Sequence, residues 1–151
     1  MGYKYGIWAI YDNNIVPTNH IGHFTVTCFM EKEDAINLYN VLVERCGLEI
    51  EIEIDRKHAI LFDKNMYKDE DNNMSSWGYI GHCKIWNELE EICKKYKCNF
   101  SHQIHTSIEY SKNDRYKKYF KYNYYYNTIT NAKLHVVDIT SDKPEDWKII
   151  I

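Results

Sequence analysis

Apolar and polar residues alternate in several stretches of the chain, and each of these stretches predicts a β-strand. The clearest is residues 48–55, LEIEIEID, in which apolar and acidic residues alternate as they do in a half-exposed strand. Other stretches are rich in the aromatic and β-branched residues that strands favour. These further predicted strands are residues 3–11, 23–30, 58–62, 103–111, 132–140 and 146–151.

Short polar turns between some of these strands predict how the strands pair. Residues 48–55 and 58–62 are close enough in sequence to form a hairpin. The turn-forming sequence SDKPE predicts a second hairpin between residues 132–140 and 146–151. Residues 77–81, WGYIG, fit neither a strand nor a helix clearly.

Two stretches have the three- and four-residue spacing of an amphipathic helix. Residues 31–46 begin with acidic residues and are followed by Gly47, a common helix end. Residues 84–97 consist mostly of good helix formers. The apolar residues that fall on one side are Ala35, Leu38, Leu42 and Cys46 in the first helix and Ile85, Leu89, Ile92, Cys93 and Tyr96 in the second.

The order of these elements predicts an α+β fold. Strands 23–30 and 103–111 each neighbour one helix in the sequence, so we expect two similar halves that face each other across a cleft. A chain of 151 residues is by default one domain, and residues 1–151 are therefore treated as a single unit.

Composition narrows the classes of function. The formal net charge is −3 at pH 7, whereas a protein that binds DNA or RNA in bulk is normally basic. A local positive patch on such a chain can still hold a small nucleotide. No apolar run reaches the roughly 20 residues needed to cross a bilayer, and the first residues lack the features of a secretory signal. We expect a cytoplasmic protein with no membrane partner.

Two histidines on two predicted strands have the same kind of neighbour. His23 is followed two residues later by Thr25, and His105 is followed by Ser107. Side chains two residues apart on a strand point to the same face, so each imidazole lies beside a hydroxyl. Histidine changes charge near pH 6.5, so one ring can serve as a base while the other serves as an acid. The hydroxyls can donate to phosphate oxygens, and this set therefore suits phosphodiester cleavage without a metal or cofactor.

These motifs resemble the paired signature of the two-histidine (2H) phosphoesterase superfamily, which includes cyclic phosphodiesterases and LigT-like enzymes. The resemblance rests on HFTV at residues 23–26 and on HTSI at residues 105–108. Residues 133–151, KLHVVDITSDKPEDWKIII, also resemble the closing hairpin of that family. Gly22 and Ile104 stand where the family often has a proline before the histidine.

The resemblance implies a bilobal α+β fold, in which two antiparallel sheets flanked by helices enclose a central cleft. It implies that His23 and His105 are the catalytic acid–base pair. It also implies that Thr25 and Ser107 bind the substrate phosphate.

Two other interpretations of the histidines remain open at this stage. The two histidines can be unrelated strand residues, although the matched hydroxyls would then be a second coincidence. The spacing of His20 with His23, and of His102 with His105, would suit a metal site on a helix. On a strand, residues three apart face opposite ways, so we expect no metal site. His20 and His102 directly precede the two strands, and we expect them to be exposed to solvent at the rim of the cleft.

Residues 109–127 combine lysines with many tyrosines, a mixture that suits nucleotides because cations bind phosphate and rings stack on bases. The competing interpretation is a tyrosine-rich segment packed on the sheet with its lysines in solvent. The candidate substrate-binding residues here are Tyr110, Tyr124 and Tyr126. Trp8 on the first strand is a further candidate, although such a residue more often belongs to the core.

The leading hypothesis is a metal-independent phosphodiesterase that hydrolyses a nucleotide with a 2′-linked or cyclic phosphate. Proteins that resemble it act on cyclic dinucleotide messengers such as cyclic GMP-AMP, on 2′,5′-oligoadenylates or on 2′,3′-cyclic phosphates, and some of these reactions blunt immune signalling by nucleotides. The alternative is a non-catalytic RNA- or nucleotide-binding module on the same fold. A third hypothesis is an interaction protein in which the motif pair is accidental.

Overall fold

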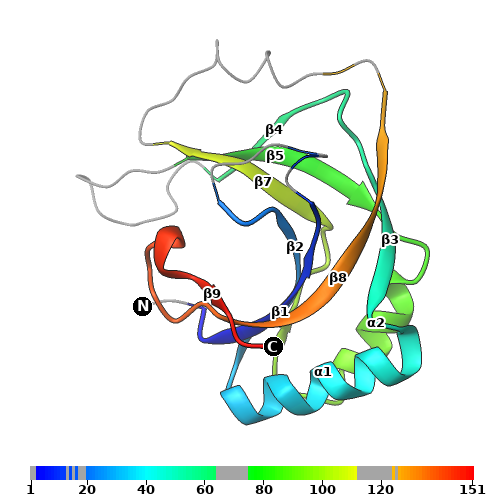
Figure 1. Ribbon diagram of the computed structural model, residues 1–151, viewed down its shortest axis with the longest axis vertical. Coiled ribbons are helices and arrows are strands. Elements are labelled where there is room, and N and C mark those ends of the chain that lie inside the picture. The colour runs from blue at the N-terminus through cyan, green and yellow to red at the C-terminus, as the bar shows by residue number, and fades with distance from the viewer. Residues whose placement is uncertain are drawn as a thin grey trace.

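The chain folds into an α+β structure, and every strand pairing described is antiparallel (Figure 1). This computed structural model describes residues 3–12, 14, 16, 20–63, 75–111, 124 and 126–151. No helix within these ranges is long and apolar enough to cross a membrane. The strands are β1 Tyr5–Ile10, β2 His23–Met30, β3 Glu49–Ile54, β4 Ile60–Asp63, β5 Ser75–His82, β6 Asn99–Phe100, β7 His105–Ser111, β8 Thr128–Asp138 and β9 Lys148–Ile149.

The strands follow the order β4-β5-β3-β8-β1-β2-β6, with β7 paired to β5 and β9 paired to β8. The predicted hairpin of β8 and β9 is confirmed, with Val137 opposite Ile149. The predicted hairpin of β3 and β4 is wrong, because β4 pairs with β5. The end of β3 from which a hairpin to β4 would start, Glu53 and Ile54, already pairs with β8 on one side and with the end of β5 on the other.

Helices α1 (Lys32–Cys46) and α2 (Trp86–Cys93) contact each other and cover the same face of the sheet (Figure 1). This arrangement differs from the expected one helix for each half. The first helix begins and ends close to its predicted bounds. The second is shorter than predicted, because hydrogen bonds from Lys95 N to Ile92 O and from Tyr96 N to Cys93 O close its last turn with three-residue spacing.

The two faces of the sheet differ in character. The face toward the helices is apolar, and its buried residues include Ile7, Phe24 and Ile52. The opposite face, called the inner face here, carries Trp8 directly across from Thr25 on β2. Because strand side chains alternate, the same strands that build the core present polar and aromatic residues on the inner face.

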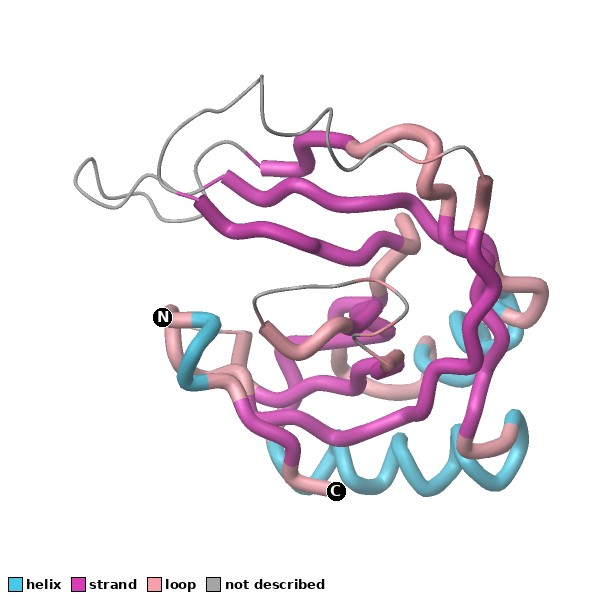
Figure 2. The backbone as a smooth tube through the Cα atoms, turned by 45° about the horizontal axis from the view of Figure 1, so that its top comes forward, coloured by secondary structure: helices cyan, strands magenta, loops and turns pink. Residues whose placement is uncertain are grey.

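Strand β5 joins two groups of strands that face each other (Figure 2). Most of β5 pairs with β4 and β7, while its end pairs with β3 through Ile54 and Gly81. Gly81 N also donates to Ile104 O, at 2.9 Å, just before β7 begins. Side chains crowd the backbone at Gly81, since an added methyl group would lie 2.8 Å from Phe24 Cε1 and 2.9 Å from Ile104 Cγ2.

Substitution Gly81→Ala should therefore destabilise the protein by about 1–3 kcal/mol, because the buried neighbours must move to admit the methyl group. Urea unfolding followed by circular dichroism measures the change. Asn131→Ala, at an exposed position of β8, is the control and should change stability by less than about 0.5 kcal/mol. Equal stabilities of Gly81→Ala and the wild type would contradict the crowding at this junction.

Candidate active site

The two predicted motifs lie on strands that pack against each other, with His23 and Thr25 on β2 and His105 and Ser107 on β7. His23 is 6% exposed and Ser107 is 7% exposed. Thr25 and His105 are half-buried. His23 and His105 are close enough for the charge of His105 to lower the pKa of His23. The structure thus brings together all four residues that the sequence singles out.

Backbone carbonyls orient the rings of both catalytic candidates, His23 and His105, in the same way. Nδ1 of His23 lies 2.7 Å from Ile21 O, and Nδ1 of His105 lies 3.1 Å from Gln103 O. A carbonyl oxygen can only accept, so Nδ1 carries the hydrogen in both rings. In a neutral ring of this tautomer, Nε2 holds the lone pair. Each histidine therefore uses the backbone two residues before it to make Nε2 the basic atom.

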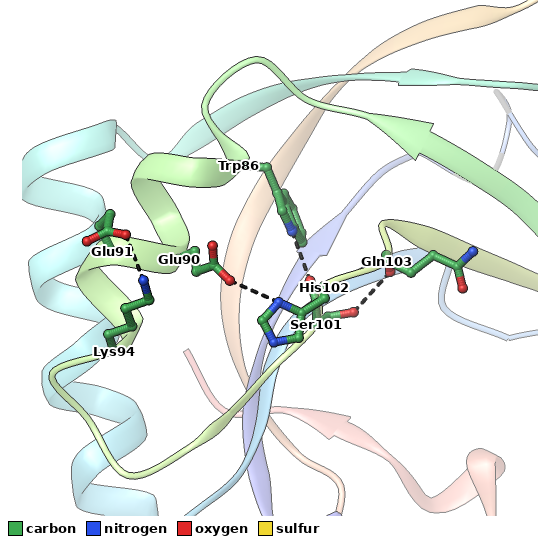
Figure 3. A network of polar contacts seen from close by, with 7 residues as sticks. All are labelled: Trp86, Glu90, Glu91, Lys94, Ser101, His102 and Gln103. Carbon is green, nitrogen blue, oxygen red and sulfur yellow. Dashed lines mark hydrogen bonds and ion pairs between the residues drawn. The ribbon is translucent and has the colours of Figure 1, made fainter.

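The turn that leads to His105 is fixed by contacts with α2 (Figure 3). Trp86 Nε1 donates to Ser101 O at 2.9 Å, and Ser101 Oγ donates to Gln103 O at 3.1 Å. Gln103 O is the oxygen that accepts from the His105 ring. His102 turns toward Glu90 on α2, with Nδ1 at 2.9 Å from Oε2. Its ring therefore pairs with a carboxylate of the helix.

His20 connects the two motif strands. Its ring lies 5.9 Å from that of His23, and it forms a hydrogen bond with the backbone of Ser107. It is half-buried, whereas the sequence suggested a solvent-exposed residue at the rim. The described ranges contain no group of three or more His, Cys, Asp or Glu side chains that could hold a metal ion. Its contact with the His23 ring and its bond to the backbone of Ser107 make His20 a link between β2 and β7.

Trp8 lies beneath His23 with its ring parallel to the imidazole. The ring centroids are 3.5 Å apart, and the planes differ by 8°. Trp147 meets Trp8 edge-on at 5.7 Å, and its own Nε1 donates to Ser141 O at 2.8 Å. Trp8 is 2% exposed and the His23 ring covers one face of its indole, so it is placed as a support for His23.

Burial and neighbouring imidazoles keep His23 uncharged. Burial is the main cause that lowers the pKa of His23 to about 3, and the charges of His20 and His105 lower it further. The hydrogen bond to Ile21 O opposes this change only in part. Burial likewise lowers the pKa of His20 to about 4. His23 is thus a neutral base with a fixed tautomer at pH 7.

The candidate substrate-binding tyrosines lie in a different environment from the two histidines. Tyr124 and Tyr126 are exposed, and the Tyr124 ring lies 3.8 Å from the Arg56 guanidinium carbon in a cation–π contact. The backbone of Tyr110 pairs with Ser76 in the β5–β7 ladder. The Tyr110 side chain and most of the segment 112–125 lie outside the described residues. A substrate-binding role for these tyrosines remains a prediction.

Sequence reasoning missed two supports of the site. It placed His20 at the rim because the residue precedes its strand, although the H-x-x-H spacing already marked it. It placed Trp147 in the closing hairpin but did not predict its contact with Trp8. The pairing of β1 between β2 and β8, which brings Trp8 under His23, is a long-range feature that no local pattern encodes.

Stability should fall as the pH is lowered from 7 to 5. The unfolded chain binds protons at His20 and His23 from about pH 6.5 downward, whereas the folded state resists protonation until about pH 4 and 3. The substitution His20→Gln removes one of these groups and should reduce the loss by roughly 2 kcal/mol at pH 5.

Urea unfolding at pH 7 and pH 5 measures this difference. The control is His82→Gln, an exposed position that leaves both buried rings in place. The same loss of stability in the wild type and in His20→Gln would show that His20 is not buried as a neutral ring.

No family model matches the chain, and a search of curated proteins finds no match to its sequence. The candidate active site is therefore defined by its own geometry: two histidines of one tautomer, each beside a hydroxyl, on two strands that pack together.

Proposed function

We propose that this protein is a metal-independent phosphodiesterase of the 2H phosphoesterase type, with His23 and His105 as its acid–base pair. The observation that carries the proposal is the matched support of the two rings, because each Nδ1 is bound to the carbonyl two residues before it. Two imidazoles with Nε2 as the reactive atom, beside two hydroxyls, can supply the base, the acid and the phosphate contacts of a phosphodiester cleavage. The two facing groups of strands joined by β5 are consistent with a bilobal fold of this type.

His23 is the better candidate for the general base. It is buried and neutral, so its Nε2 can accept a proton from an attacking water or from a neighbouring ribose hydroxyl. As the proton leaves, the attacking oxygen forms a bond to phosphorus in line with the departing oxygen. His105, which is half-buried and closer to solvent, then donates a proton to the departing oxygen as the P–O bond breaks.

Thr25 and Ser107 have a separate role in this mechanism. Negative charge accumulates on the non-bridging phosphate oxygens in the transition state, and hydroxyl donors there lower its energy. With the imidazolium of the acid, these hydroxyls supply the electrophilic assistance that a metal ion provides in other phosphodiesterases. The proposed substrates are nucleotides with a 2′-linked or cyclic phosphate, including the cyclic dinucleotides and 2′,5′-oligoadenylates of immune signalling.

The purified protein should cleave at least one member of a panel of cyclic dinucleotides, 2′,5′-oligoadenylates and 2′,3′-cyclic mononucleotides, and EDTA should not reduce the rate. Removing either imidazole removes one proton transfer, so His23→Ala and His105→Ala should each lower kcat by about 10²–10⁴-fold. Chromatography of the reaction products over time measures both effects.

His82→Ala, which removes an exposed histidine on β5, is the matched control and should keep wild-type turnover. Thr25→Val and Ser107→Ala should retain the pH profile and lose part of kcat, because they remove a charge-stabilising donor and leave the proton transfers intact. Full activity of His23→Ala or His105→Ala would reject the mechanism. Binding of a panel member without turnover would instead favour the non-catalytic nucleotide-binding module.

A further inference from the structure

The support of His23 differs from the usual support of a catalytic histidine. Such rings are commonly oriented by a carboxylate that accepts from Nδ1 and stabilises the imidazolium. Here the acceptor is the neutral carbonyl of Ile21, and among the described residues the groups whose charges act on His23 are two other imidazoles. The bond to Ile21 O raises the pKa of His23 less than burial lowers it, and the two imidazoles lower the pKa further, so neither takes the place of a carboxylate. The imidazole also stacks on the face of Trp8.

Trp8 is held rigidly enough to orient another ring. Its strand, β1, is hydrogen-bonded on both sides, with Trp8 opposite Thr25 on β2 and opposite His135 on β8. Trp8 belongs to a small buried cluster with Val137 and Ile139. Trp147 packs against the indole edge-on, and its own ring is anchored by the Ser141 carbonyl. Rotation of the indole would require these contacts to break together.

The parallel stack has two consequences for His23. The indole face fixes the plane of the imidazole, while the bond to Ile21 O fixes its rotation within that plane, so the direction of Nε2 is determined. An indole face also attracts a cation through its quadrupole, and this attraction strengthens where water is excluded. The stack therefore favours the imidazolium at the moment when His23 accepts a proton.

We propose that Trp8 is a positioning residue of the reaction, whose indole orients the His23 ring and stabilises the imidazolium that forms on it in place of a carboxylate. This inference rests on the proposed function of His23 as the base. It replaces the expectation that Trp8 binds substrate. Because the indole does not contact substrate, its loss should affect the chemical step and leave substrate binding unchanged.

The test compares Trp8→Leu, which removes the aromatic face, with Trp8→Phe, which keeps a weaker one. Trp8→Leu should lower kcat by about 3- to 30-fold, the range of a desolvated cation–π contact, with KM nearly unchanged. Trp8→Phe should recover part of this loss. The matched control is Trp77→Phe, a buried tryptophan of β5 in a different core cluster from Trp8, which should keep the wild-type kcat.

Nuclear magnetic resonance of the imidazole nitrogens and ring protons gives a second readout without substrate. In the wild type, the His23 ring protons should be shifted upfield by the indole, and the nitrogens should report hydrogen on Nδ1. In Trp8→Leu, the ring protons should move toward their unfolded positions, and the nitrogens should report a mixture of tautomers. Trp77→Phe should leave these signals unchanged.

A wild-type kcat in Trp8→Leu, a loss confined to KM, or unchanged His23 signals would each overturn the proposal. If Trp8→Leu does not fold, Trp8→Phe decides, since a partial loss of kcat with shifted ring protons supports the proposal and wild-type values refute it. If the wild type cleaves no member of the nucleotide panel, the proposed function fails. The magnetic resonance signals then still decide whether Trp8 orients His23.

Discussion

The double pairing of β5 is the constraint on which the candidate site depends. One part of β5 binds β7, which carries His105 and Ser107, and its end binds β3 in the larger group of strands. Gly81 stands at this junction because a larger residue would collide with Phe24, Ile104 and Ile52. The position of β7 opposite β2 follows from this connection. His20 adds a second connection through the backbone of Ser107.

The surroundings of His23 combine features that suit the general base of the proposed mechanism. Burial alone would only make the ring neutral and would oppose any later protonation. The carbonyl of Ile21 selects the tautomer, and the indole of Trp8 offers a face that tolerates a positive charge. The lowered pKa keeps the ring neutral at rest, and in the proposed mechanism the indole face offsets part of the cost of protonating it. His105 shares the backbone support but remains closer to solvent, which suits a residue that must regain a proton in each cycle.

Local sequence patterns predicted the parts of the structure that local forces determine. Strand β2, helix α1 and the closing hairpin follow from side-chain periodicity and turn residues, and the shared face of His23 and Thr25 follows from the period of a strand. The partner of β4 could not be predicted, because it depends on which strands occupy the edges of β3. The short strand β6 gives too few residues for a pattern. The stack of Trp8 on His23 depends on the register between β1 and β2, which tertiary packing sets.

The central claim is that the imidazoles and hydroxyls on β2 and β7 contact one substrate phosphate from opposite sides. A crystal structure with orthovanadate, which imitates pentavalent phosphorus, tests this claim most directly. The account predicts one vanadate between β2 and β7, with oxygens about 2.6–3.2 Å from Nε2 of both His23 and His105 and from the hydroxyls of Thr25 and Ser107. A vanadate bound elsewhere, or rings whose Nε2 atoms point away from a shared anion, would contradict it.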